Sequence, residues 1–417
     1  MTSAPNRLPQ LSGNRWLVFL LITLIVGACS PKVRWVSHPA GKPVDTVKRQ
    51  PVVVAPPKAK PGVQKQSVIS LLLPFGLDHI GPGLGYTDVS LRKARIAADY
   101  YRGFKLALDS LTFYGYNYKL QVYDSRDDAA QAHSLAYNQQ IRASDLIVGP
   151  VFPEGLKALT SVLTSPRKAI VSPLSPEAPG VFSNQNLVTM NPPLEFHAWC
   201  AGLYVYEHMK PQKVFILRSG YSGENDYINL FKHTIDTLSK HHIKVIQLTV
   251  KRGQLAPLIA QLSKTQQNVF FVPSTDEPFL LVTLRSLDTL ANKYPVTLFG
   301  HPSWEHFTFL KAELLQHLKT HITSEGSVDY KSEATITFIR NYRAAYHTEP
   351  SDYSIKGFDE GMYFGQLLAT TGVKDLDQKP YGGLHGKFNF AKIPGQGWVN
   401  SHVNLLLYSN FELKPVE

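Results

Sequence analysis

The sequence predicts an α/β protein of two lobes, each a doubly wound parallel sheet, that follow an N-terminal apolar segment and a basic tether. From Ser67 onward, continuous apolar runs alternate with amphipathic helical patterns, as expected for strands covered on both faces and joined by right-handed crossovers. The series breaks at Asn191-Pro192-Pro193 and then starts again. A chain of 417 residues also fits two domains of ordinary size better than one.

Eight apolar runs are expected as strands, with a last strand near residues 403–408. These runs are residues 68–73, 118–123, 145–148, 168–171, 213–217, 243–248, 268–272 and 295–299. Apolar residues spaced at 3.6 predict helices around Tyr100, Phe231 and Leu258, and two more helices follow Ser324. We therefore expect lobe 1 at residues 67–193, completed by about 327–384, and lobe 2 at residues 194–326, completed by about 385–417.

Positive charge is concentrated at the N-terminus. The chain holds 43 Lys and Arg against 32 Asp and Glu, a net charge of +11, but residues 1–66 account for +9 of it. The remaining 351 residues carry 33 basic and 31 acidic side chains. A nearly neutral globular part argues against nucleic acid as a partner.

Residues 16–26 form an uncharged apolar run of eleven residues after Arg7 and Arg15. The run is too short to span a bilayer comfortably and matches the apolar region of a secretory signal. Val26-Gly27-Ala28 then precedes Cys29, which resembles a bacterial lipobox, in which the cysteine thiol is diacylated after cleavage. We expect a signal peptide at residues 1–28 and lipidation at Cys29; the alternative is an ordinary signal peptide beside a buried cysteine.

The second cysteine, Cys200, lies in an apolar helical stretch and is expected as a small buried residue. Residues 29–66 are expected as a lipidated tether, because residues 30–66 combine eight Lys and Arg with seven prolines and have no apolar period. Ser30 and the lack of a following acidic run resemble the sorting signal for membrane retention. The expected location is the cell envelope, lipid-anchored and facing the periplasm.

Several motifs follow one another along the folded part of the chain. They include Leu71-Leu-Leu-Pro-Phe75, Tyr101-Arg-Gly-Phe-Lys-Leu-Ala-Leu-Asp109, Asp145-Leu-Ile-Val-Gly-Pro150, Ile170-Val-Ser-Pro-Leu-Ser175 and Gly386-Lys-Phe-Asn-Phe390. The order of these motifs resembles the type I periplasmic-binding fold of leucine/isoleucine/valine-binding proteins. The chain is also similar to penicillin-binding-protein activator lipoproteins, which share this fold. The resemblance implies a non-enzymatic protein that closes two lobes about a ligand.

Motifs for catalysis, cofactors or metals are weak. Gly81-Pro-Gly-Leu-Gly85 has the wrong spacing for a dinucleotide loop, and Pro82 lacks a backbone N–H. His241-His242 are adjacent rather than at helical ligand spacing. Asp127-Asp128 are better explained as charges at a helix start. We expect no catalytic residue, no cofactor and no metal.

In open parallel sheets, ligands bind at the carboxyl ends of strands, so the residues just after the predicted strands are the candidate ligand-binding residues. In lobe 1 these are Phe75, Asp78, Asp124, Arg126, Val151, Phe152, Ser172, Ser175 and Asn191. In lobe 2 they are Tyr221, Ser274, Asp276 and His301. Each could equally be a loop residue that satisfies local backbone groups.

One departure from the family concerns the turn after the third strand. Amino-acid-binding members place a Ser or Thr shortly after the Gly-Pro turn, whereas Val151-Phe152-Pro153 follow it here. Ser172 and Ser175 could compensate. The expected ligand is amino-acid-like or anionic, and an ABC permease would then be the partner. The alternative is a cell-envelope regulator that contacts a peptidoglycan synthase.

Overall fold

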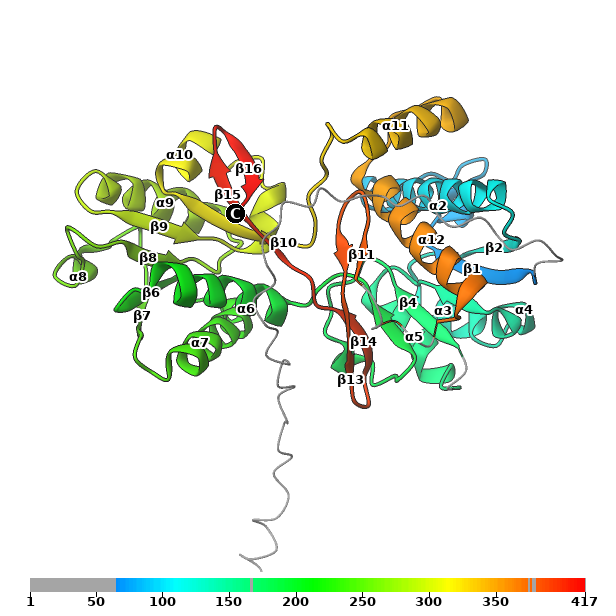
Figure 1. The fold of residues 1–417 in the computed structure, drawn as a ribbon, viewed down its shortest axis with the longest axis horizontal. Coiled ribbons are helices and arrows are strands. Elements are labelled where there is room, and N and C mark those ends of the chain that lie inside the picture. The colour runs from blue at the N-terminus through cyan, green and yellow to red at the C-terminus, as the bar shows by residue number, and fades with distance from the viewer. Residues whose placement is uncertain (1–64, 166–167, 374–375, 377–379, 417) are drawn as a thin grey trace, which may run out of the picture. The chain divides into compact units, whose positions relative to one another are not determined.

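The computed structural model describes residues 65–165, 168–373, 376 and 380–416, and these residues form two lobes (Figure 1). The first lobe contains a seven-stranded sheet in the order β13-β14-β5-β4-β3-β1-β2. Its strands are β1 (Ser67–Leu73), β2 (Tyr118–Asp124), β3 (Leu146–Val148), β4 (Ala169–Ser172), β5 (Leu187–Thr189), β13 (Phe390–Ile393) and β14 (Gly397–Asn400). All its neighbouring pairs are parallel except β13 with β14.

The second lobe contains another seven-stranded sheet, in the order β16-β15-β10-β9-β8-β6-β7. Its strands are β6 (Lys213–Arg218), β7 (Lys244–Thr249), β8 (Asn268–Phe271), β9 (Val296–Phe299), β10 (Thr320–Ser324), β15 (Asn404–Ser409) and β16 (Glu412–Pro415). The strands β6 to β10 run parallel, and β15 and β16 are antiparallel additions at one edge. The predicted fold class, two α/β lobes with parallel-dominated sheets, is confirmed.

Helices flank both sheets (Figure 1). The first lobe has α2 (Asp88–Phe113), α3 (Ala129–Leu135), α4 (Gln139–Ala143), α5 (Pro153–Val162), α11 (Glu333–Tyr346) and α12 (Asp352–Thr370), and a small ribbon of β11 (Tyr381–Gly382) and β12 (Lys387–Phe388). The second lobe has α6 (Leu194–Tyr204), α7 (Asn225–Ser239), α8 (Ala256–Ile259), α9 (Glu277–Ala291) and α10 (Ala312–His317). None of these described helices is long and apolar enough to cross a membrane.

Helices α2 and α12 lie side by side and form the tightest helix pair of the first lobe (Figure 1). Glycines permit this approach: a Cβ added to Gly103 would overlap the carbonyl oxygen of Ser354, and one on Gly357 would overlap the carbonyl oxygen of Tyr100. The backbones of the two helices are therefore in direct contact, and the buried rings of Tyr100 and Phe104 fill the space beside them.

Three segments of the described chain pass between the lobes. They are residues 190–193 after β5, residues 325–332 after β10, and residues 401–403 between β14 and β15. Each starts at the carboxyl end of a strand. The close packing between elements of the described residues otherwise falls within one lobe or the other.

The structure departs from the sequence-based expectation in three places. The stripe around Leu258 forms only the single turn α8 instead of a long helix. The strands β5 and β10 are not among the predicted strands. β5 is short and β10 is polar, so neither has the apolar run that marks the other central strands. Residues 385–400, expected in lobe 2, lie with the first lobe, because β14 pairs with β5 through Trp398 and Val188.

Candidate ligand-binding site

The carboxyl ends of the parallel strands in both sheets point toward the segments that cross between the lobes, because β5 and β10 run directly into two of these segments. This is where open parallel sheets bind ligands. The residues expected there from the sequence do lie at these strand ends. The contacts of each side chain decide what it can offer to a ligand.

Asp124 ends β2, and its carboxylate is used by the backbone of its own lobe. Oδ1 accepts hydrogen bonds from the N–H groups of Gly76 at 3.1 Å and Arg126 at 2.9 Å, and Oδ2 accepts one from Leu77 at 2.7 Å. Three N–H donors occupy most of the lone pairs of a carboxylate. Asp124 therefore holds the loop after β1 in place.

Arg126 is the cation most available at the first lobe's strand ends. Its side chain is 48% exposed, and Nη1 lies 3.9 Å from Oδ2 of Asp78, which is also exposed. An ion pair this long and this exposed contributes little, so the guanidinium can exchange Asp78 for an anionic group of a ligand. Phe75 lies beside this loop and packs edge-on against Tyr101, with ring centroids 6.2 Å apart.

The turn after β3 offers apolar surface. Val151 is buried, whereas Phe152 is half-buried, precedes α5, and has the ammonium of Lys93 5.1 Å from its ring centroid. The two serines of the next loop differ. Ser175 Oγ accepts a hydrogen bond from the N–H of Glu177 at 3.3 Å, while the fully buried Ser172 Oγ has no partner among the described residues.

Most strand-end side chains of the second lobe accept hydrogen bonds from backbone N–H groups of their own turns. Asp276 caps α9 by accepting from the N–H of Phe279, and Ser274 Oγ accepts from the N–H of Asp276. Nδ1 of His301 accepts from the N–H of Ser303, and burial lowers the pKa of His301 to about 4, so its ring is neutral at pH 7. Tyr221 is 66% exposed and is the most exposed of the four candidate side chains of the second lobe.

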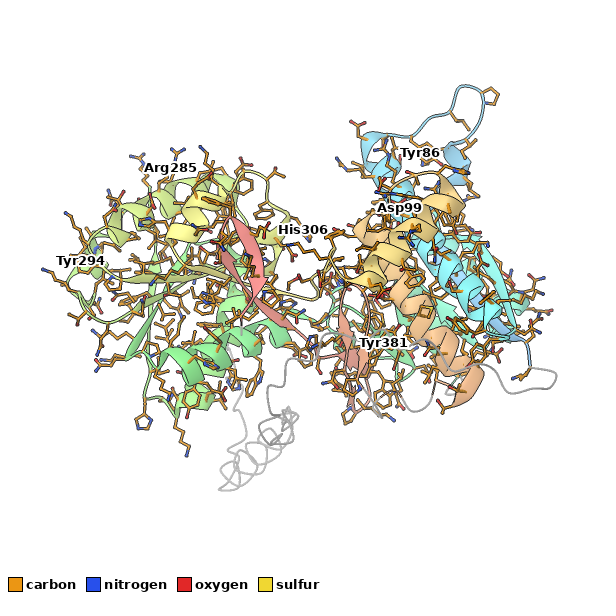
Figure 2. All side chains as sticks on the ribbon, turned by 45° about the horizontal axis from the view of Figure 1, so that its top comes forward. Tyr86, Asp99, Arg285, Tyr294, His306 and Tyr381 are labelled. Carbon is orange, nitrogen blue, oxygen red and sulfur yellow. The ribbon has the colours of Figure 1, made fainter. Side chains whose placement is uncertain are left out.

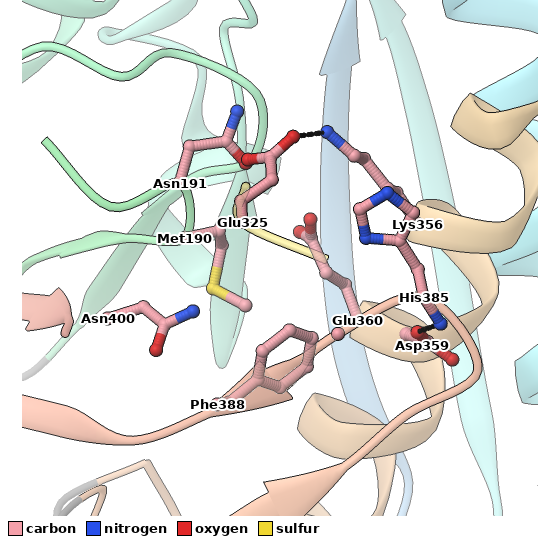
Figure 3. Close-up of a pocket in the computed structure, with 10 residues that line it drawn as sticks. Met190, Asn191, Glu325, Lys356, Asp359, Glu360, His385, Phe388 and Asn400 are labelled. Carbon is pink, nitrogen blue, oxygen red and sulfur yellow. Dashed lines mark hydrogen bonds and ion pairs between the residues drawn. The ribbon is translucent and has the colours of Figure 1, made fainter. Parts of the chain in front are cut away.

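A small pocket lies where two of the crossing segments and the end of β14 meet α12 and the β11–β12 ribbon (Figure 3). Asn191 belongs to this pocket and donates Nδ2 to the carbonyl of Leu174 at 2.8 Å. The free volume is about 20 Å³, little more than one water molecule needs, so an amino acid does not fit in it.

Charged groups of the chain itself fill this pocket. Glu325, directly after β10, pairs with Lys356 of α12 (Figure 3). Tyr100 Oη donates a hydrogen bond to Glu360 at 2.7 Å. Burial lowers the pKa of Lys356, but Glu325 outweighs this effect and raises it. Burial also raises the pKa of Glu360 well above its usual range, since Lys356 offsets only part of the desolvation.

Asp359 holds the β11–β12 ribbon against α12. Its carboxylate accepts hydrogen bonds from the N–H groups of Leu384 and His385, both at 2.7 Å. Burial raises the pKa of Asp359 to about 7 and lowers the pKa of His385 to about 4. The crossing segment after β10 is thus joined to the first lobe by the Glu325–Lys356 ion pair and by the backbone of Gly326 and Gly386.

The other motifs weighed in the sequence have structural roles. Asp128 caps α3 through the N–H of Gln131, and Asp127 pairs with Lys93. His241 pairs with Asp236 at 3.6 Å. Cys200 is mostly buried, with Sγ 3.8 Å from the carbonyl of Val403. In the part of the chain that the structure describes, no three His, Cys, Asp or Glu side chains form a group that could hold a metal.

Solved structures of the same architecture are numerous, although no protein-family model and no curated protein matches the chain. A branched-chain amino acid ABC transporter protein from Rhodospirillum rubrum matches with a TM-score of 0.62 at 12% identity, covering 84% of this chain and 100% of that one. A substrate-binding protein from Desulfitobacterium hafniense, solved with Leu, matches with a TM-score of 0.55 at 15% identity and the same coverage. The chain has the type I periplasmic-binding fold.

A third match with this fold is full-length LpoA from Haemophilus influenzae, with a TM-score of 0.57 at 12% identity. The match covers 85% of this chain but only 59% of LpoA. The resemblance inferred from the sequence, to substrate-binding proteins and to activator lipoproteins of this fold, is confirmed at the level of the fold.

Sequence reasoning missed the charged cluster at the crossing segments. Its members Glu325, Lys356, Asp359 and Glu360 come from a loop and from one face of α12. The only signal in the sequence was the helical pattern of α12, where Lys356, Asp359 and Glu360 occupy positions that an amphipathic helix turns inward together. A charged residue on such a face indicates a buried partner.

Proposed function

We propose that this chain is a non-enzymatic ligand-binding protein of the cell envelope, which captures a small solute between its two lobes. The observation that carries this proposal is the position of the three crossing segments at the carboxyl ends of the strands. Short segments of this kind act as a hinge, and strand ends on either side of a hinge form a site that closes on its ligand. An ABC permease would receive the solute.

The ligand we propose carries a carboxylate or another small anion. Arg126 supplies a weakly paired guanidinium, Phe152 supplies an apolar face, and Tyr221 supplies an exposed ring on the opposite lobe. The missing hydroxyl after Gly149-Pro150 and the engagement of Ser175 argue against the carboxylate site of the amino-acid-binding members, so Arg126 would hold the anionic group of the solute instead.

A thermal-shift screen tests this function directly. With L-leucine, the other amino acids and small aromatic carboxylates at 1 mM, we expect at least one to raise the melting temperature by about 2 °C or more, because ligand bound only to the folded state stabilises it. Arg126→Ala should abolish this shift. Arg285→Ala, on the exposed face of α9 (Figure 2), is the matched control and should retain it. A panel without any stabilising ligand would contradict solute capture.

A second candidate is a regulator of the penicillin-binding-protein activator type that contacts a peptidoglycan synthase. One observation favours it: most polar strand-end side chains, such as Asp124, Ser175 and Asp276, already bind their own backbone. The fold match to LpoA is consistent with this candidate. It predicts crosslinks to a synthase at the exposed strand-end loops and no ligand-dependent change in the distance between the lobes.

We also propose a lipid anchor at Cys29, which lies outside the described residues. Cys29→Ser should remove the acylated thiol, so that the protein is no longer recovered in the detergent-extracted membrane fraction. Fractionation followed by immunoblotting measures this change, and Cys200→Ser is the control that should leave membrane recovery intact. Equal membrane recovery of Cys29→Ser and the unaltered protein would refute the anchor.

A further inference from the structure

A large hollow lies at the opposite end of the first lobe's sheet, where the parallel strands begin. Its volume is about 740 Å³, within the range of small-molecule sites. Ser67 at the start of β1, Lys168 just before β4 and the carboxyl end of α12 border it. Because parallel strands begin at one sheet edge and end at the other, this hollow is separate from the strand-end site described above.

Positive charge in this hollow is not neutralised. Lys65, Lys168 and Lys392 line it, against the single acid Asp145. Both oxygens of Asp145 are engaged: Oδ2 accepts from the N–H of Val68 at 2.8 Å, and Oδ1 lies 3.6 Å from Lys65 Nζ. Within the described residues, neither Lys168 nor Lys392 forms an ion pair. Burial lowers the pKa of Lys168, and the nearby carboxylate of Asp145 offsets part of this effect.

An indole and two carboxamides accompany these lysines. Trp398 of β14 is partly exposed and has the ammonium of Lys392 5.4 Å from its ring centroid. Gln185 and Asn186 lie on the rim, and Asn186 Nδ2 donates to the carbonyl of Ser165 at 2.8 Å. An aromatic face packs against the C–H face of a sugar ring, while carboxamides bind hydroxyl and acetamido groups. The ammonium of Lys392 lies over the indole ring, so a sugar ring that packs on this face would displace it sideways, where it can pair with an anionic group of the sugar.

We propose that this hollow binds an anionic saccharide, whose carboxylate pairs with Lys168 and Lys392 and whose ring packs on Trp398. Residues 29–64, which remain after the proposed cleavage, do not complement the charge of the hollow, because they contain seven Lys and Arg and a single Asp. Their charge instead adds to the attraction for an anion. The inference does not depend on the solute-capture function, since it concerns the other edge of the sheet.

The test uses the full-length protein in detergent and two disaccharides that differ only in a lactyl carboxylate. Calorimetric titration with N-acetylglucosaminyl-N-acetylmuramic acid should give a dissociation constant at least tenfold lower than with diacetylchitobiose. The preference should weaken between 50 and 300 mM NaCl, because surface charge pairs are screened. Pelleting with purified cell-wall sacculi then distinguishes a polymer-bound saccharide from a free one, and either result supports the proposal.

Lys168→Gln combined with Lys392→Gln should abolish the preference for the carboxylated disaccharide while the melting temperature stays unchanged. The matched control is Lys264→Gln combined with Lys311→Gln, two exposed lysines of the second lobe, which should keep it. Equal affinity for the two disaccharides, binding of neither, or a preference that survives in the Lys168→Gln and Lys392→Gln variant would overturn the proposal. The Arg126-dependent thermal shift reports on the strand-end site separately.

Discussion

Replacing Lys356 with methionine is expected to lower the free energy of unfolding by about 3 kcal/mol. The side chains of Lys356 and Glu325 are only 14% and 26% exposed, so the substitution leaves a carboxylate largely buried without its counter-charge. This loss is at the lower end of the range for breaking a buried ion pair, because Glu325 keeps some access to water. Urea unfolding followed by circular dichroism measures the change in midpoint and slope.

The control for this substitution is Lys105→Met. Lys105 pairs with Asp109 at 2.6 Å on the surface of α2, with side chains 42% and 55% exposed, and its loss should change the free energy of unfolding by less than about 1 kcal/mol. Lys356→Met combined with Glu325→Gln should regain most of the lost stability, because no unpaired charge remains. If Lys356→Met destabilises no more than Lys105→Met, the ion pair has no role in joining the crossing segment to α12.

Gly103→Ala is expected to destabilise the protein by about 3 kcal/mol or to prevent folding. The added methyl group would meet the backbone carbonyl of Ser354, which cannot rotate away as a side chain can. The two helices would have to separate along their whole contact, and the buried rings of Tyr100 and Phe104 would lose packing. Thermal unfolding and the yield of soluble protein measure the effect.

Gly85→Ala is the matched substitution, because no atom lies within 4 Å of the added Cβ and the backbone is not left-handed there. Its effect should stay within about 0.5 kcal/mol. Similar losses for the two variants would contradict the close approach of α2 to α12 as the source of the destabilisation, because the lower entropy of the unfolded chain favours folding in both variants.

The fold was largely predictable because its central strands are continuous apolar runs, such as Val68–Leu73 within β1 and residues 268–272, which contain β8. The polar strand β10, Thr-His-Ile-Thr-Ser, could not be recognised in this way. It forms a strand because parallel pairing with β9 and antiparallel pairing with β15 satisfy its backbone hydrogen bonds. Of these two partners, β9 has the apolar run, and β15 is distant in the sequence.

The candidate site was less predictable than the fold. Strand-end positions follow from the strands, so Asp124 and Arg126 could be placed, but their hydrogen bonds to Gly76, Leu77 and Asp78 depend on how the preceding loop turns. The Glu325–Lys356 pair joins residues 31 positions apart through a crossing segment. The inward position of Lys356 on α12 indicates a buried partner, but a single sequence carries no signal that this partner is Glu325.

The addition of β14 to the edge of β5 affects how the polypeptide folds during synthesis. The first lobe's sheet begins at Ser67 but is completed only by residues up to Asn400, which pair with a strand made some two hundred residues earlier. A nascent chain that stops before β14 leaves the backbone of β5 without its partner, and such open edges invite association with other chains. Neither lobe is therefore a contiguous fragment that could be cut out and expressed alone, and the first one can finish folding only near the end of synthesis.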